Sequence, residues 1–135
     1  MTLTDTGPLV ALIDKGDAGH APCQQALPRL SVPLLSTWPC VTETMYLLGR
    51  VGGYRYQMAL WGLWAAQKLM IHELSLPEVA RMQALMDTYR DAPMDLADAS
   101  IVATAETLSV RRAFTLDRHF YAYRTADGQA LDVVP

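Results

Sequence analysis

Short apolar runs alternate along the chain with longer segments of helical periodicity. The short runs predict buried β-strands, and the longer segments, which start near Pro or a capping Ser, Thr or Asp, predict helices. The predicted strands are Met1–Asp5, Pro33–Ser36, Met70–Leu74, Ala113–Leu116 and Leu131–Val134. The predicted helices are Leu9–Ile13, Ala18–Leu30, Pro39–Val51, Tyr54–Lys68, Pro77–Tyr89 and Leu96–Leu108. This alternation is typical of an α/β domain with a mainly parallel sheet of about four to five strands, and residues 1–135 are expected to form one such domain.

The helix predicted at Tyr54–Lys68 has almost no polar face, because Met58, Trp61 and Trp64 stand there among Leu and Ala. Such a helix is either deeply buried or part of an interface. The chain is 51% hydrophobic with a mean hydropathy of +0.10, and surplus apolar surface is most readily buried in a partner. We therefore expect a homodimer or a heteromeric complex, and we assign Tyr46 and both tryptophans to the core or to an interface rather than to base stacking.

Four carboxylates lie against or inside apolar sequence: Asp5, Glu43, Asp98 and Asp117. Removing one unpaired carboxylate from water costs several kcal/mol, so four of them suggest a shared divalent cation. Asp5 and Asp117 end predicted strands, whereas Glu43 and Asp98 lie about one turn into predicted helices. Strand ends and helix starts share one edge of a parallel sheet, where sites form, and helix N-termini tolerate negative charge. We expect the four carboxylates to lie within reach of one ion.

Each acid also has a purely structural interpretation, which the sequence leaves open. These are a helix N-cap for Asp5, a partly exposed first-turn acid for Glu43, a hydrogen-bonded buried acid for Asp98 and a cap of the turn Arg118–Tyr121 for Asp117. A fifth acid, Asp95, is interpreted as the cap of the helix that starts at Leu96. All four structural interpretations would have to hold together to remove the case for a cation.

Net charge and cysteine content limit the partners and the cellular compartment that we expect. A net charge of −3 gives no general attraction to nucleic acid. The chain has two lysines, Lys15 and Lys68, beside nine arginines; arginine favours phosphate and carboxylate contacts, but high-GC genomes also encode many. Cys23 and Cys40 have no metal-binding spacing, and the sequence predicts neither a secretory leader nor a membrane span. We therefore expect a reduced, cytoplasmic protein.

Other chemistries fit the sequence poorly. The segment Thr4-Asp5-Thr6-Gly7 matches the Asp-Thr-Gly signature of aspartic proteases, but that fold is all-β and three segments of this chain are strongly helical. The three histidines have no zinc-ligand spacing, and neither a glycine-rich phosphate loop nor a Gly-x-Ser-x-Gly motif occurs. A protease, a zinc site and a serine hydrolase are therefore set aside.

Four motifs resemble those of the PIN-domain family, and most closely the VapC-type toxins of bacterial toxin–antitoxin modules. They are Asp5-Thr6 after a short apolar strand, Glu43 opening the apolar stretch Thr44–Leu48, the segment Leu96–Ala105 around Asp98, and the segment Phe114–Phe120 around Asp117. Each motif is weak alone, whereas their order and spacing over essentially the whole chain are specific.

The resemblance implies a three-layer α/β/α fold and a metal-dependent endoribonuclease. The family pattern assigns the binding of one or two Mg²⁺ or Mn²⁺ ions to an acidic quartet: Asp5, Glu43, Asp98 and Asp117, with Asp95 as an optional further member. It assigns Thr6 and Thr115 to the hydroxyl positions beside the quartet. A bound ion can activate water for attack on a phosphodiester, and a second ion about 4 Å away can stabilise the leaving oxygen.

The partners implied by the resemblance are RNA, a small antitoxin protein and a second copy of the chain. We expect the antitoxin to press an apolar helical tail into a groove, and Tyr54–Lys68 to contact either protein partner. Arg118, Arg111 and Arg112 are candidates for contacts with RNA phosphates, and solvated arginines are the alternative. Two other functions stay open: a non-catalytic PIN-like adaptor, and a nuclease that processes RNA or cleaves DNA without a toxin role.

Overall fold

The computed structural model describes residues 1–135. Its centre is one sheet of five parallel strands. The strand order is β3-β2-β1-β4-β5, so the first strand lies at the centre. The strands are β1 (Thr2–Thr4), β2 (Leu34–Thr37), β3 (Leu69–His72), β4 (Arg112–Phe114) and β5 (Asp132–Val134). The helices are α1 (Thr6–Ile13), α2 (His20–Ala26), α3 (Trp38–Gly52), α4 (Tyr54–Ala65), α5 (Leu76–Thr88) and α6 (Leu96–Leu108), with the 3₁₀ turns η1 (Leu27–Arg29) and η2 (Arg118–Tyr121).

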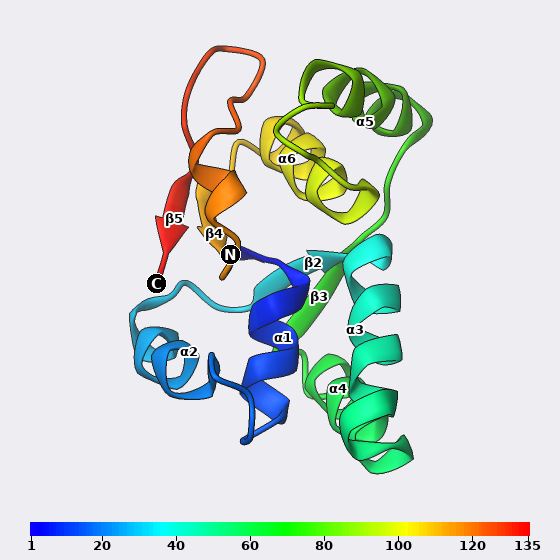
Figure 1. The fold of residues 1–135 in the computed structure, drawn as a ribbon, viewed down its shortest axis with the longest axis vertical. Helices are drawn as coiled ribbons and strands as arrows, with labels where there is room; N and C mark the ends of the chain where they lie inside the picture. The colour runs from blue at the N-terminus through cyan, green and yellow to red at the C-terminus, as the bar shows by residue number, and fades with distance from the viewer.

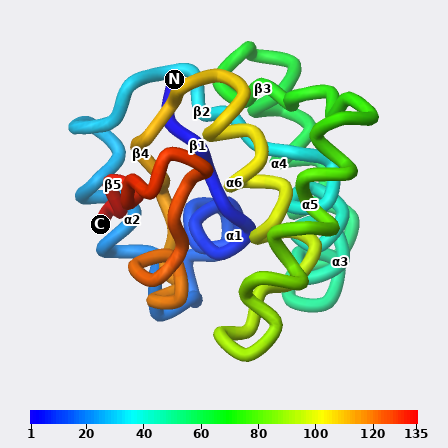
Figure 2. The backbone as a smooth tube through the Cα atoms, turned by 90° about the horizontal axis from the view of Figure 1, so that it is seen from above, coloured from blue at the N-terminus to red at the C-terminus, as the bar shows by residue number.

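Helices cover both faces of the sheet and give the molecule three layers (Figure 1). α5 and α6 pack together on one face, α1, α2 and α4 lie on the other, and α3 contacts both α1 and α6. Figure 2 shows α1 nearly end-on, with α2 and the C-terminus on one side of it and α5 and α6 on the other. The predicted three-layer α/β/α fold with a parallel sheet is confirmed. None of the helices has the length and apolar character that crossing a membrane requires.

Strand residues alternate between two hydrophobic cores. In β2, Leu34 packs in the core of α1 and α4, whereas Leu35 packs in the core of α5 and α6. Phe114 and Ala113 of β4 divide in the same way. Because both faces of the sheet are covered, successive side chains of the inner strands β1 and β2 are all buried, and these strands appear in the sequence as short, mostly apolar runs.

Most predicted elements differ from the structure by one to three residues at their ends, and two of these differences have a clear local cause. The helix predicted at Ala18–Leu30 is divided into α2 and η1, because Pro28 has no amide hydrogen with which to continue an α-helix. The third strand is Leu69–His72 rather than Met70–Leu74, because its neighbour β2 ends at Thr37, which pairs with His72.

Side chains cap two of the helices, and the cap at Asp95 is the one predicted above. Ser75 and Asp95 each form a capping box at the starts of α5 and α6, and Asp95 accepts a hydrogen bond from the Asp98 amide at 2.8 Å. Thr37 precedes α3 but does not cap it with its side chain. Its hydroxyl lies 2.6 Å from the Ser100 hydroxyl instead, so it ties β2 to α6.

α4 is the helix that the sequence assigned either to the deep core or to an interface. It follows Gly53, whose φ of 68° favours glycine and turns the chain away from α3. Only Leu60 of α4 is buried, whereas Tyr54, Trp61 and Trp64 are exposed. α4 is therefore a surface helix with a partly apolar outer face, and the deep-core alternative is wrong.

Candidate active site

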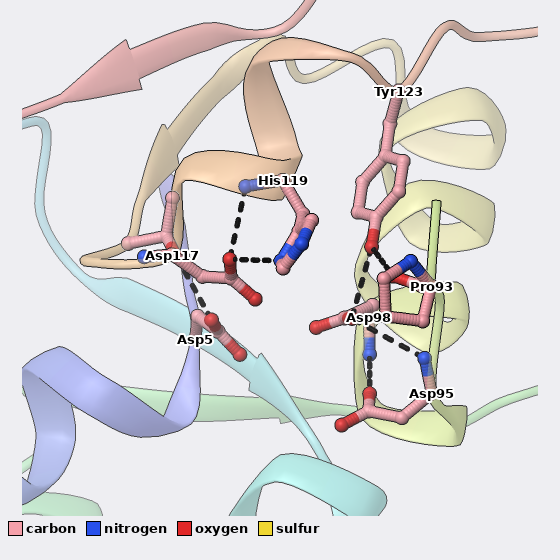
Figure 3. A network of polar contacts seen from close by, with 8 residues as sticks. Asp5, Pro93, Asp95, Asp98, Asp117, His119 and Tyr123 are labelled. Carbon is pink, nitrogen blue, oxygen red and sulfur yellow. Dashed lines mark hydrogen bonds and ion pairs between the residues drawn. The ribbon is translucent and has the colours of Figure 1, made fainter. Parts of the chain in front are cut away.

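The predicted site carboxylates gather at the carboxyl edge of the sheet. Asp5 follows β1 and Asp117 follows the neighbouring strand β4. Asp98 lies in the first turn of α6, and Glu43 lies in the second turn of α3. Figure 3 shows Asp5 and Asp117 on one side of this acidic edge, facing Asp98 on the other.

Asp5 is 7% exposed and takes its hydrogen bonds from distant segments. Its Oδ2 accepts from the Thr115 hydroxyl at 2.9 Å, and its Oδ1 accepts from the Cys40 thiol at 3.8 Å. It occupies the N-cap position of α1 but makes no side-chain capping bond, so the N-cap interpretation is wrong. Burial is the main cause that raises the pKa of Asp5, and the charges of Asp117 and Asp95 act in the same direction.

Asp98 is 6% exposed and accepts hydrogen bonds on one oxygen from two groups. The Asp95 amide lies 3.3 Å and the Tyr123 hydroxyl 3.1 Å from its Oδ2. That hydroxyl also lies 2.7 Å from the Pro93 carbonyl oxygen, and its single proton can serve only one acceptor at a time. Burial, followed by the charges of Asp95 and Asp5, raises the pKa of Asp98 to about 7. The interpretation of Asp98 as a hydrogen-bonded buried acid is confirmed, but it is an acid without a counter-ion.

Glu43 and Asp117 are less buried than their apolar neighbours in the sequence suggested. Glu43 is exposed, and its Oε2 accepts a hydrogen bond from the Thr6 hydroxyl at 3.2 Å. Asp117 is half-buried and caps η2, accepting from the His119 amide at 2.9 Å and lying 2.7 Å from His119 Nδ1. The interpretation of Asp117 as a cap is therefore correct, and that of Glu43 is correct in its exposure but not in its turn, because Glu43 lies in the second turn of α3. Both positions are compatible with the acidic edge.

The carboxylates lie along the same edge of the sheet but do not converge on one position. No three His, Cys, Asp or Glu side chains stand close enough together to hold a metal ion as they are, so the expectation that all four carboxylates lie within reach of one ion is not met. The reason is local: Asp98 is turned toward Tyr123 and the first turn of α6, and Asp117 is turned toward His119.

The chemistry of the edge nevertheless fits a hydrated divalent cation. Neither Asp5 nor Asp98 forms an ion pair with a basic side chain. The charge of Asp5 is among the causes that raise the pKa of Asp98. Carboxylate and hydroxyl oxygens are ligand atoms that suit Mg²⁺ and Mn²⁺. Mg²⁺ keeps several of its waters, so a few carboxylates that do not touch one another can hold it.

The structure brings only one of the three candidate arginines to this edge. Arg118 directly follows Asp117, is exposed and forms no ion pair. Arg112 begins β4, at the opposite end of the strand from Asp117, and pairs with Asp132 at 2.9 Å. Arg111 precedes it and donates to a carbonyl of the C-terminal loop. Arg111 and Arg112 are therefore not part of the acidic edge.

Three further residues of the site were not predicted as members. Cys40 lies one helical turn before Glu43 on α3, so helical spacing could have predicted it. Tyr123 is 25 residues beyond Asp98, and no local pattern indicates their contact. His119 has no zinc-ligand spacing, and its role at the edge is the contact with Asp117.

Comparisons with known proteins agree with this geometry. The protein-family model described as "PIN domain" matches residues 2–126. A curated relative, ribonuclease VapC26 of Mycobacterium tuberculosis, is 26% identical over 134 residues, which are 98% of this chain and 99% of the relative. The predicted resemblance to VapC-type PIN domains is confirmed.

Two solved structures share the fold. VapC20 of M. tuberculosis, described as a sarcin–ricin loop cleaving toxin, has a TM-score of 0.86 and 18% identity over all of both chains. A chain of a toxin–antitoxin complex from Klebsiella pneumoniae has a TM-score of 0.71 and 22% identity, over 100% of this chain and 97% of that one. At these identities the likeness establishes the fold alone.

Replacing Tyr123 by Phe should weaken divalent-cation binding without unfolding the protein. The ring keeps its edge-on contacts with Tyr89 and Phe120, both at centroid distances of 5.1 Å, whereas Asp98 loses the hydroxyl that orients it. Loss of such an orienting bond typically costs about 10- to 100-fold in metal affinity, so the Mn²⁺ dissociation constant should rise about tenfold or more in calorimetric titration. Tyr121→Phe, on an exposed ring, is the matched control. An unchanged dissociation constant would leave Tyr123 with a structural role only.

The raised pKa of Asp98 predicts how stability depends on pH when no divalent ion is present. The folded protein favours the neutral carboxyl, so this contribution to stability is fully present below the ordinary pKa of 3.8 and is lost as the pH rises through about 7. Asp98→Asn should therefore reduce the loss of melting temperature between about pH 5.5 and about pH 8. Mg²⁺ should raise the wild-type melting temperature more at the higher pH, where protons no longer compete. Calorimetry against the exposed control Asp91→Asn tests this, and an unaltered pH dependence in Asp98→Asn would contradict it.

Proposed function

We propose that this chain, which belongs to the PIN-domain family, is a metal-dependent endoribonuclease and the toxin component of a type II toxin–antitoxin system. The observation that carries the proposal is the pair of buried carboxylates, Asp5 and Asp98, which share one edge of the sheet and have no positively charged partner. The name of the ribonuclease VapC26 and the description of VapC20 as a toxin that cleaves the sarcin–ricin loop favour RNA as the substrate. A cytoplasmic location follows from that substrate.

The proposed ligands for one or two Mg²⁺ or Mn²⁺ ions are the quartet Asp5, Glu43, Asp98 and Asp117. A bound ion supplies positive charge beside the scissile phosphate and makes an attacking water more acidic. The hydroxyls of Thr115 and Thr6 orient Asp5 and Glu43 by donating hydrogen bonds at 2.9 Å and 3.2 Å. Asp95 acts indirectly, because its side chain holds the amide of Asp98 at 2.8 Å and fixes the first turn of α6.

The negative charge of the acidic edge makes the cation a condition for substrate binding. Without the ion, the carboxylates repel the phosphates of the RNA backbone. Arg118 is the proposed phosphate contact at this edge, because it is exposed beside Asp117 and forms no ion pair. RNA should therefore bind weakly to the metal-free protein.

Cleavage of a mixed RNA pool should require Mg²⁺ or Mn²⁺ and the Asp98 carboxylate. A bound cation contributes several kcal/mol to stabilising the transition state, so Asp98→Asn should lower kcat/KM by about 100-fold or more, and EDTA should abolish cleavage. Asp91→Asn, an exposed aspartate in the loop before α6, is the matched control and should cleave normally. End-labelled substrates resolved on sequencing gels distinguish internal cuts from trimming.

Three results would contradict this function in different ways. Cleavage that persists in EDTA, or at the wild-type rate in Asp98→Asn, would show that the activity does not come from the acidic edge. Equal cleavage of single-stranded DNA would favour a general nuclease. Absence of cleavage with every metal and substrate would favour the non-catalytic adaptor.

We further propose that the outer face of α4 contacts a second copy of the chain. This face exposes Tyr54, Met58, Trp61 and Trp64, and the two indole rings pack edge to face with centroids 5.8 Å apart. Tryptophan is among the residues that contribute most to protein–protein binding. Exposed indoles on a surface helix are therefore suited to an interface.

The inner side of α4 suits the antitoxin. An apolar cavity of about 650 Å³ lies between α4, α1 and the start of β2, and its walls include Leu12, Leu27 and Leu63. An amphipathic helical tail is the kind of ligand that such a groove accepts. The match to a chain of a toxin–antitoxin complex supports a partner of this class.

Replacing Trp61 or Trp64 by Glu should dissociate the dimer. Loss of a central tryptophan together with burial of a new charge costs at least about 2 kcal/mol, so the dimer dissociation constant should rise more than about 30-fold. Light scattering after gel filtration measures the mass, with Tyr121→Glu as an exposed control outside α4. A monomeric wild type would contradict the dimer, and a variant that stays dimeric would assign the interface to another surface.

A further inference from the structure

An open groove of about 730 Å³ lies beside the acidic edge, between the first turns of α3 and the start of α6. Two of its lining residues, Glu43 and Asp95, also belong to the acidic edge. The groove therefore continues directly from the place where a scissile phosphate would lie in the proposed function.

Exposed aromatic side chains form the apolar wall of this groove. Trp38 and Tyr46 lie two helical steps of four residues apart, on the same face of α3, and are 41% and 62% exposed. Leu96, which is 54% exposed, lines the groove from α6. Of the two alternatives for Tyr46, the core is therefore wrong, and its ring is available to a ligand.

The polar atoms of both rings already have partners. Trp38 Nε1 donates to Glu73 Oε1 at 3.4 Å, and Arg50 Nη1 donates to the Tyr46 hydroxyl at 3.5 Å. The Arg50 guanidinium also lies 5.9 Å from the Tyr46 ring centroid. Arg50 is seven residues beyond Glu43 on α3, which is about 10 Å along the helix axis. Along α3 the order is therefore Trp38, Glu43, Tyr46 and Arg50, so the two rings flank Glu43 and the positive charge lies beyond Tyr46.

We propose that this groove binds an unpaired nucleobase next to the scissile phosphate, with Trp38 and Tyr46 as stacking surfaces and Arg50 as the contact for the neighbouring phosphate. The proposal rests on the ribonuclease function and names its substrate class as single-stranded RNA. Such RNA presents flat bases between phosphates, and aromatic side chains flanked by basic ones bind it. The groove likewise places an acid of the edge between two aromatic rings, with an arginine beyond Tyr46.

Charge complementarity favours a nucleotide over an apolar polypeptide in this groove. An apolar segment, such as the helical tail expected of an antitoxin, would bury Glu43 and Asp95 against apolar side chains without supplying a counter-charge, which is costly. A nucleotide instead brings a phosphate, which the cation held by the acids attracts. The nucleotide therefore satisfies the acids and the aromatic wall together.

The test measures RNA affinity and cleavage for the full chain. A short fluorescein-labelled single-stranded oligoribonucleotide is titrated in Mg²⁺, with Asp98→Asn as the background so that cutting is slow during the measurement. Trp38→Ala and Tyr46→Ala should each weaken binding about tenfold, because base stacking on one aromatic ring contributes roughly that factor or more, whereas Tyr46→Phe should bind normally. In the cleaving protein the same changes should raise KM more than they lower kcat. Val79→Ala, on the exposed face of α5, is the control.

A scan of one abasic position along the oligonucleotide identifies the base that occupies the groove. An abasic site at one position only should weaken RNA binding about tenfold. With that oligonucleotide, Trp38→Ala should weaken binding little further, because the base that the ring stacks on is already missing. Normal affinity and KM in both alanine variants would overturn the groove proposal while leaving the ribonuclease in place. Weakened RNA binding in the variants of a chain that never cleaves RNA would support the groove and overturn the nuclease. If the alanine variants keep their RNA affinity but change the molar mass of the protein in solution, the groove is a contact between protein chains, and the proposal is overturned.

Discussion

Two carboxylates that have left water without a cation, Asp5 and Asp98, are the constraint on which the rest of this molecule depends. Burial raises the pKa of both, and each also lies within reach of other negative charge. Such a pair lowers the stability of the fold, and proteins keep perturbed acids mainly where a function requires them. Here neutral donors surround the acids in place of cations: Thr115 and Cys40 for Asp5, and Tyr123 for Asp98.

Regular secondary structure, rather than mobile loops, positions this pair. β1 lies at the centre of the sheet, and the amide of Asp5 continues the β1–β4 ladder by donating to the Phe114 carbonyl at 3.0 Å. On the other side, a capping box fixes the first turn of α6 and therefore the place of Asp98. Sites supported by strands and helices hold their geometry before a ligand arrives. The acidic edge can thus meet a hydrated cation without folding around it.

Local signals in the sequence were sufficient for most of the fold. The strand–helix alternation and the capping boxes at Ser75 and Asp95 depend on residues within one or two turns of each other. Membership of the acidic edge was also predictable, because a carboxylate in an apolar segment breaks the local pattern. The directions of the carboxylates were not, because Asp98 turns toward Tyr123, whose position is set by tertiary packing 25 residues away. The exposure of α4 was hidden for a related reason: an apolar helix face looks the same in the sequence whether a core or a partner covers it.

β1 is synthesised before the other strands of this sheet, and it pairs with β4, the fourth of the five. The hydrogen bond between Thr115 and Asp5 joins residues 110 positions apart, and Tyr123 reaches Asp98 from even nearer the end of the chain. Segments emerge from the N-terminus onward during synthesis, so neither carboxylate has these partners while the chain is being made. The acidic edge is therefore among the last parts of this domain to gain its hydrogen-bond partners during synthesis, although its first carboxylate is made at the start.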